Sequence, residues 1–73
     1  MRRSFYQFLM TKRNPSSYEP VAQFANNAFL DQAFPKQATN FDDLSRYFEL
    51  NGNYLPSMDV FDDAWHQYLE SEM

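Results

Sequence analysis

Apolar residues recur at intervals of three and four along most of the chain, which is the spacing of one face of an α-helix. The pattern predicts four helices, at about residues 4–12, 20–33, 41–50 and 58–71. The last stretch repeats it most fully, with apolar side chains at five helical positions: Phe61, Ala64, Trp65, Tyr68 and Leu69. With no internal repeat and no linker in sight, we expect a single all-α domain over residues 1–73, a compact four-helix bundle.

Residue types at the predicted helix starts agree with these boundaries. Ser4 followed by Gln7 three positions later is the pattern of a capping box. Pro20 suits the first turn of a helix, because its missing N–H would have no partner there. Thr39 or Asn40 is expected to cap the third helix, and Ser57 to open the fourth.

The predicted helix ends carry breakers. Pro35 disfavours helical geometry at the residue before it and is expected to stop the second helix. Asn51-Gly52 is also a strong hairpin signal, so a strand must be considered. The residues before it continue a helical stripe without alternation, and a glycine just past a helix commonly terminates it. The pair therefore predicts a helix end.

Composition supports the all-α prediction. The 73 residues include one glycine, no isoleucine and only four β-branched side chains, Thr11, Val21, Thr39 and Val60, so material for strands is scarce. Cysteine is absent, which removes disulfides and fits a reducing cytoplasm. Stability must then come from packing, and eight large side chains are expected in the core: Phe5, Phe8, Phe24, Phe29, Phe41, Phe48, Phe61 and Trp65.

The Arg2-Arg3 pair near the start resembles a twin-arginine export signal, which requires a long apolar stretch after the arginines. Here the apolar run covers only residues 5–10 and contains Gln7. No stretch approaches the 18 or more apolar residues of a membrane span. The sequence therefore predicts a cytoplasmic protein without a membrane association.

Several segments share a pattern with one known group of proteins: Ser4-Phe5-Tyr6-Gln7-Phe8-Leu9-Met10, Ala33-Phe34-Pro35-Lys36, Asn40-Phe41-Asp42-Asp43-Leu44-Ser45, Val60-Phe61-Asp62-Asp63-Ala64-Trp65 and Tyr68-Leu69-Glu70. In this order they resemble the YozE-like family, small uncharacterised proteins of low-GC Gram-positive bacteria. The resemblance spans nearly the whole chain. It implies a four-helix fold of the sterile-alpha-motif-like type. It implies no activity and no site residues, because the family has no assigned biochemical function.

Residue patterns typical of enzymes are weak. Asp63 and His66 have the carboxylate-x-x-His spacing of di-metal bundles, and Asp59 precedes them by one turn. The apolar stripe of the same helix places all three on the opposite, solvent-facing side. One histidine, no cysteine and one glycine offer neither a triad nor a phosphate-binding loop. We therefore expect no enzyme, no catalytic residue, no metal and no cofactor.

The net charge of −4 conceals an uneven distribution. Residues 1–36 have a balance of +3 and residues 37–73 a balance of −7. This asymmetry is typical of an electrostatic contact surface, for a partner or between copies of the domain. Compensation of helix dipoles is the favoured explanation, with the acids in the first turns of the third and fourth helices and the bases near the ends of the first two.

Two functions remain. The first is a non-enzymatic protein-protein interaction module that docks an unknown partner or itself, with Tyr54, Leu55 and Met58 as a contact patch. The simpler interpretation of that patch is that it closes one end of the core. The alternative function is weak electrostatic nucleic-acid binding through the basic half, and the candidate contact residues are Arg2, Arg3, Lys12 and Arg13. Overall acidity makes nucleic acid the weaker prediction, and no small-molecule substrate is evident.

Overall fold

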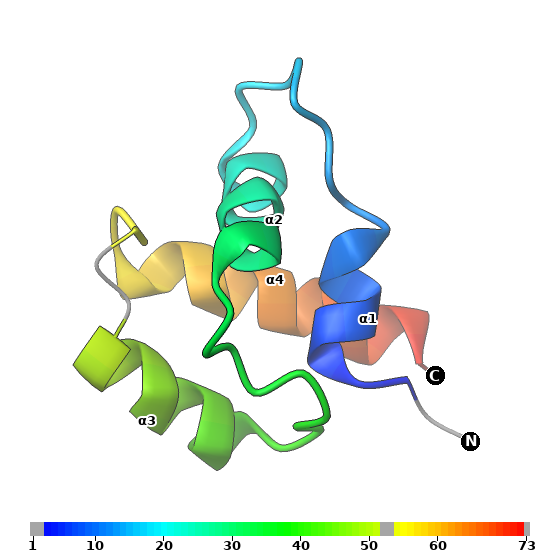
Figure 1. Ribbon diagram of the computed structural model, residues 1–73. Helices are drawn as coiled ribbons and strands as arrows, with labels where there is room; N and C mark the ends of the chain where they lie inside the picture. Colours follow the sequence, from blue (N-terminus) through cyan, green and yellow to red (C-terminus); the bar gives the residue numbers. More distant parts are fainter. Residues whose placement is uncertain (1–2, 52–53, 73) are drawn as a thin grey trace.

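The chain forms α1 (Phe5–Met10), α2 (Pro20–Leu30), α3 (Phe41–Asn51) and α4 (Met58–Ser71), shown in Figure 1. This computed structural model describes residues 3–51 and 54–72, and within that part of the chain there is no strand. The prediction of an all-α four-helix fold is confirmed. Of the predicted Asn51-Gly52 terminator, Asn51 is the last residue of α3 and Gly52 lies outside the described residues.

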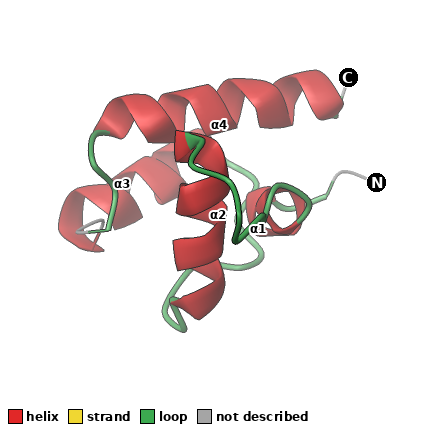
Figure 2. Cartoon of the chain, turned by 90° about the horizontal axis from the view of Figure 1, so that it is seen from above, coloured by secondary structure: helices red, strands yellow, loops and turns green. Residues whose placement is uncertain are grey.

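Three of the helices, α1, α2 and α4, pack against one another pairwise. In both views α3 lies at the far side of this group from the two chain ends (Figures 1 and 2). The Cα radius of gyration is 11.1 Å. A folded chain of this length is expected to have a radius of about 11 Å, so the four short helices close into one globule.

The predicted helix starts are observed. The Ser4 hydroxyl accepts the Gln7 N–H and the Gln7 side chain accepts the Ser4 N–H, which completes the capping box of α1. Pro20 is the first residue of α2. Of the two predicted caps of α3, Asn40 is the one observed, because its Oδ1 accepts the Asp43 N–H at 3.0 Å. Ser57 is the N-cap of α4.

The first helix is shorter than the predicted 4–12 and ends at Met10. The Thr11 hydroxyl donates to the Phe8 carbonyl at 2.6 Å, and the Thr11 N–H donates to the same oxygen at 3.0 Å. These bonds tighten the chain into a turn that no longer follows the helical path. Lys12, which the prediction included, lies outside the helix.

The second helix is also shorter than the predicted 20–33, because Asp31 leaves helical geometry with ψ near 100°. Its Oδ1 accepts the Ala33 N–H at 3.1 Å, and its carbonyl accepts the Phe34 N–H at 3.2 Å. An aspartate that binds the backbone two residues ahead offers the chain an alternative to the helix. Asp31 therefore stops α2 before Pro35 can.

Aromatic rings make up most of the core. Phe5 and Phe61 are fully buried and meet edge to face with ring centroids 5.7 Å apart. Tyr68 is also fully buried, and its ring lies 5.6 Å from that of Phe5. Edge-to-face and tilted arrangements are the favourable ones for aromatic pairs. The prediction that aromatic packing stands in for disulfides agrees with this arrangement.

Two of the eight predicted core residues are wrong. Phe29 is 48% exposed and Phe41 is 38% exposed. The guanidinium of Arg13 covers Phe29, 3.6 Å from the ring centroid, and Phe41 stacks on Phe61 at the edge of the core. Phe34, which the helical pattern did not select, is 3% exposed. It enters the core because the chain turns inward after Asp31.

Phe34→Ala and Phe29→Ala make a matched pair. Truncation of a buried phenylalanine costs about 3–5 kcal/mol, so Phe34→Ala should lower the melting temperature by at least about 12 °C in a domain of this size. Phe29→Ala removes a half-exposed ring and should cost about 1 kcal/mol at most. Thermal unfolding followed by circular dichroism tests this, and equal shifts would show that Phe34 is not a core residue.

Candidate functional site

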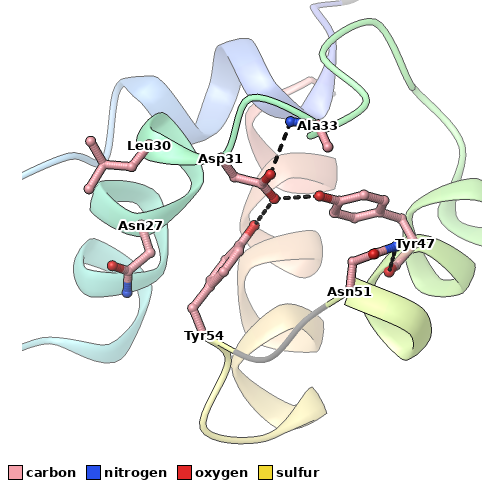
Figure 3. A pocket seen from close by; sticks show the side chains of 7 residues that line it. All are labelled: Asn27, Leu30, Asp31, Ala33, Tyr47, Asn51 and Tyr54. Carbon is pink, nitrogen blue, oxygen red and sulfur yellow. Dashed lines mark hydrogen bonds between the residues drawn. The ribbon is translucent and has the colours of Figure 1, made fainter.

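Asp31 connects three separate segments of the chain. Its Oδ2 accepts the Tyr47 hydroxyl of α3 at 2.5 Å and the Tyr54 hydroxyl of the α3–α4 connection at 2.9 Å. Its Oδ1 accepts the Ala33 N–H, so three donors converge on one carboxylate (Figure 3). Asp31 lies at the end of α2, and the network therefore fixes α3 and the residues after it to that end.

The hydrogen bonds change the acidity of all three side chains. Burial alone would raise the pKa of Asp31, but the bonds from Tyr47, Tyr54 and the Ala33 N–H, together with the charge of Lys36, outweigh it, and the pKa is lowered from its usual value of 3.8. Burial and the charge and hydrogen bond of Asp31 raise the pKa of Tyr47 to about 12. The same causes raise the pKa of Tyr54. At neutral pH the site holds one carboxylate and two neutral phenols.

This network forms the floor of an open groove with a volume of about 430 Å³. Asn27 and Leu30 line one side from α2, and Tyr47 and Asn51 line the other from α3, as Figure 3 shows. A smaller hollow of about 180 Å³ follows along α2 toward Pro20 and shares Asn27 and Tyr54 with the first. Together they form one groove, called here the α2 groove.

The predicted contact patch lies partly in the α2 groove. Tyr54 and Leu55 are half-buried, pack against the core and line the groove. They therefore close the end of the core and also present a surface. Met58 is 37% exposed and lies outside the groove lining. Leu30, which the sequence analysis did not select, is 73% exposed at the rim.

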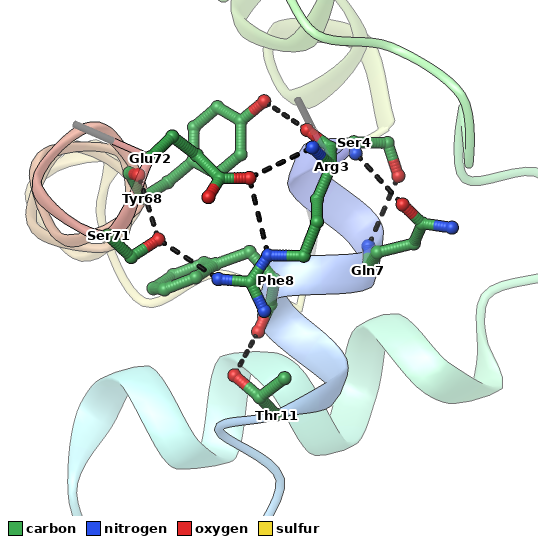
Figure 4. A network of polar contacts seen from close by, with 8 residues as sticks. All are labelled: Arg3, Ser4, Gln7, Phe8, Thr11, Tyr68, Ser71 and Glu72. Carbon is green, nitrogen blue, oxygen red and sulfur yellow. Dashed lines mark hydrogen bonds and ion pairs between the residues drawn. The ribbon is translucent and has the colours of Figure 1, made fainter. Parts of the chain in front are cut away.

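Of the predicted basic contact residues, Arg2 lies outside the described residues. Arg3 joins the two ends of the described chain, as Figure 4 shows: its Nε lies 3.2 Å from Glu72 Oε1 and its backbone N–H donates to the same oxygen at 2.9 Å. Its Nη2 donates to the Ser71 hydroxyl at 3.1 Å. The Tyr68 hydroxyl donates to the Arg3 carbonyl at 2.5 Å. Arg3 therefore has a structural role.

The other cations of the first half lie over aromatic rings. Lys12 lies 5.4 Å from the centroid of Phe8, Arg13 lies 3.6 Å from Phe29, and Lys36 lies 5.7 Å from Tyr6. Such contacts are worth about 0.5–1 kcal/mol at exposed sites. Nucleic-acid binding through the basic half stays a prediction.

Dipole compensation explains three of the eight acids in residues 37–73 and none of the described bases. Asp42 and Asp43 occupy the first turn of α3, and Asp59 occupies that of α4, where negative charge is favourable. No last turn of the four helices, all within the described residues, contains a basic residue. The described bases of the first half instead contact aromatic rings or Glu72.

The acidic face of α4 gathers no metal site. Asp59, Asp63 and His66 are exposed, as the apolar stripe of the helix predicts. Among residues 3–51 and 54–72 no group of three or more His, Cys, Asp or Glu side chains is placed to hold a metal ion. None of the helices in this part of the chain is long and apolar enough to cross a membrane.

Sequence reasoning missed the Asp31 network. No binding or catalytic pattern in the sequence singles out Asp31 or Tyr47 as a site residue. One signal was available: an aspartate directly after the apolar stripe of a helix often turns the chain through its own side chain. The partners of its other carboxylate oxygen come from residues 16 and 23 positions away, and no local pattern indicates them.

Four helices around an aromatic core, with α3 held across the end of α2, define a sterile-alpha-motif-like domain. The family model described as "YozE SAM-like fold" matches residues 4–70, and the chain belongs to this family. A "UPF0346 protein" from Levilactobacillus brevis is 70% identical to this chain and covers 94% of both proteins. A protein of the same name from Lactiplantibacillus plantarum is 64% identical and covers 99% of both. The resemblance seen in the sequence is confirmed.

Asp31→Asn tests the network through its pH dependence. Because the pKa of Asp31 is lowered in the folded state, its stabilisation is complete above the unfolded pKa and is lost as pH falls through the folded value. At pH 6 the variant should lose about 1 kcal/mol, or about 4–8 °C in melting temperature. The difference from wild type should shrink below pH 3.8.

The control is Glu49→Gln, which removes an exposed carboxylate in the last turn of α3. Negative charge is unfavourable there, so this variant should be unchanged or slightly more stable at pH 6. An Asp31→Asn variant with a constant stability difference from pH 6 to pH 2 would contradict the role given to the carboxylate.

Glu72→Gln tests the contact between the chain ends. The Arg3 side chain is 40% exposed and that of Glu72 is 13% exposed, so the ion pair should contribute about 1 kcal/mol at most. The loss, measured by urea unfolding, should diminish in 1 M salt, where the screening length is about 3 Å. Glu70→Gln, at an exposed position of α4, should change little; a salt-independent loss in Glu72→Gln would argue against an ionic contribution.

Proposed function

We propose that this domain is a non-enzymatic, cytoplasmic protein-protein interaction module that docks another protein or a second copy through the α2 groove. The observation that carries the proposal is Leu30, 73% exposed at the rim of an open groove whose wall includes Tyr54 and Leu55. An exposed leucine beside half-buried aromatic and aliphatic side chains offers apolar area that a partner can bury.

The size of the domain agrees with such a role. A standard protein interface covers about 800 Å² on each partner, which is about a sixth of the 4871 Å² accessible surface of this domain. Burial of Leu30 would supply about 1.5–3 kcal/mol. The polar groups around Asp31 contribute to the orientation of a bound partner more than to its affinity, since donors and acceptors fix how the partner lies.

The chemistry of the groove favours binding over catalysis. A general base works best with a pKa near the operating pH, whereas the hydrogen bonds to Asp31 and the charge of Lys36 outweigh burial and lower the pKa of Asp31. The two phenols have raised pKa values and already donate to this carboxylate. All three groups are engaged with one another, which is typical of a structural network that shapes a surface.

The proposal is tested with the immobilised full chain in a native lysate, read by quantitative mass spectrometry. A partner that docks in the α2 groove should bind wild type and be reduced about tenfold on Leu30→Ser, the loss of one buried leucine. Tyr18→Ser is the control, because Tyr18 is 90% exposed and lies outside the groove lining. The captured protein, once purified, should show the same loss in direct titration.

Light scattering at high protein concentration tests whether the partner is a second copy of the domain. A dimer that Leu30→Ser dissociates and Tyr18→Ser leaves intact supports docking through the groove. The proposal would be overturned if wild type is a monomer in light scattering and captures no protein from the lysate that Leu30→Ser does not also capture.

A further inference from the structure

Two helices end at the α2 groove with no basic residue in their last turns, both of which the structure describes in full. Asn27 and Leu30 belong to the last turn of α2, and Asn51 is the last residue of α3. A helix C-terminus carries about half a negative charge, which basic side chains usually offset. Two such ends therefore add their negative potential at one place.

Asp31 adds a full charge to the same place and has acceptor capacity left. A carboxylate has about four acceptor positions. Oδ2 receives both tyrosine hydroxyls, while Oδ1 receives the Ala33 N–H alone. In the described part of the chain the only ion pair is that of Arg3 with Glu72. Lys36 acts on Asp31 through its charge but forms no ion pair with it, so the carboxylate can still bind a cation directly.

We infer that the α2 groove binds a basic segment of another protein, with a lysine or arginine directed at Asp31 and the ends of α2 and α3, and an aliphatic neighbour on Leu30. This inference rests on the proposed function and names the chemistry of its partner. A cation–carboxylate bond inside a groove lined by Asn27, Tyr47 and Asn51 is charge-assisted and directional.

The shape of the groove favours a peptide over a small cation. It runs along α2 from Pro20 to the end of the helix, and eleven residues of helix are about 16 Å long. An extended segment of about five residues has this length. Beyond Asp31 the lining changes to Leu55 and Pro56 on one side and Gln23 on the other. Leu55 and Pro56 suit aliphatic groups, and Gln23 can bond a backbone amide, a group that a small polyamine lacks.

A second copy of this chain fits the groove less well. Its Arg46 is exposed, but Asp42, Asp43 and Glu49 lie three or four residues from it on the same helix, so docking Arg46 would bring these acids to the groove. Lys12, Arg13 and Lys36 already lie over Phe8, Phe29 and Tyr6. Arg3 is bound to Glu72. Docking one of these on Asp31 of another copy would give up the contact it has. A basic segment of a different protein gives up none of them.

The test measures fluorescence anisotropy of two labelled pentapeptides with the full-length protein, one alternating lysine and leucine, the other alternating glutamate and leucine. Asn27→Lys and Asn51→Lys place a positive charge in the groove at exposed positions, and each should weaken the lysine peptide by about tenfold. Gln67→Lys makes the same change of net charge on exposed α4 and should weaken it by about twofold at most. Amide shifts in NMR spectra should centre on Asn27, Leu30 and Tyr54.

Folding of the variants has its own readout. A lysine in the last turn of α2 or α3 should raise stability by about 0.3–1 kcal/mol, so Asn27→Lys and Asn51→Lys are expected to unfold no earlier than wild type. Loss of peptide binding in a variant with an unchanged or higher melting temperature supports the inference.

Any of the following results would overturn the inference. Equal binding of the glutamate peptide, or an equal loss in Gln67→Lys, would show that the groove does not select the cation. Spermidine that displaces the lysine peptide at equal concentration would make the ligand a small cation. A dimer dissociated by Asn27→Lys would make the occupant a second copy. If Leu30→Ser loses a captured partner but the lysine peptide does not bind wild type, the inference is refuted and the proposed function stands.

Discussion

The ring of Phe48 attaches α3 to the rest of the domain. It lies 5.0 Å from the ring of Phe61 in α4, 5.3 Å from Phe24 in α2 and 5.6 Å from Phe34 in the connection between α2 and α3. The other three helices pack on one another directly, whereas α3 is held by its side chains: Phe48 and Leu44 in the core, Phe41 at its edge, and the bond from Tyr47 to Asp31. Because α3 forms one side of the α2 groove, the burial of Phe48 in the core also maintains the groove.

The polar layer above Phe48 sets the shape of that groove. Asp31 stops α2, turns the chain toward Phe34 and binds the hydroxyls of Tyr47 and Tyr54. One aspartate thus determines where a helix ends, where its neighbour lies and where negative charge is concentrated. A protein without cysteine can define a surface with such precision because a partly buried carboxylate with several donors permits few arrangements.

Helix periodicity was enough to predict four helices and most of the core, since burial of an apolar stripe depends on spacing that the sequence displays. It was wrong for Phe29, which follows the stripe of α2 but lies under the guanidinium of Arg13 in partial contact with solvent. It also missed Phe34, whose burial results from the turn at Asp31. Tyr54 and Leu55 were predicted as a patch from their size and position, while Leu30 was not. Exposure of an apolar residue at a helix end depends on what packs beside it, and that is a property of the tertiary structure.

The contact of Arg3 with Glu72 and Ser71 brings positions almost seventy residues apart to one edge of the domain, away from α3. A short link between these positions would therefore introduce little strain into the fold. The four helices could then follow one another along the chain from a different starting point. The domain is suited to circular permutation, with new ends opened at residues 14–17 between α1 and α2. It is equally suited to insertion into a surface loop of a host protein, which would enter and leave it at one point.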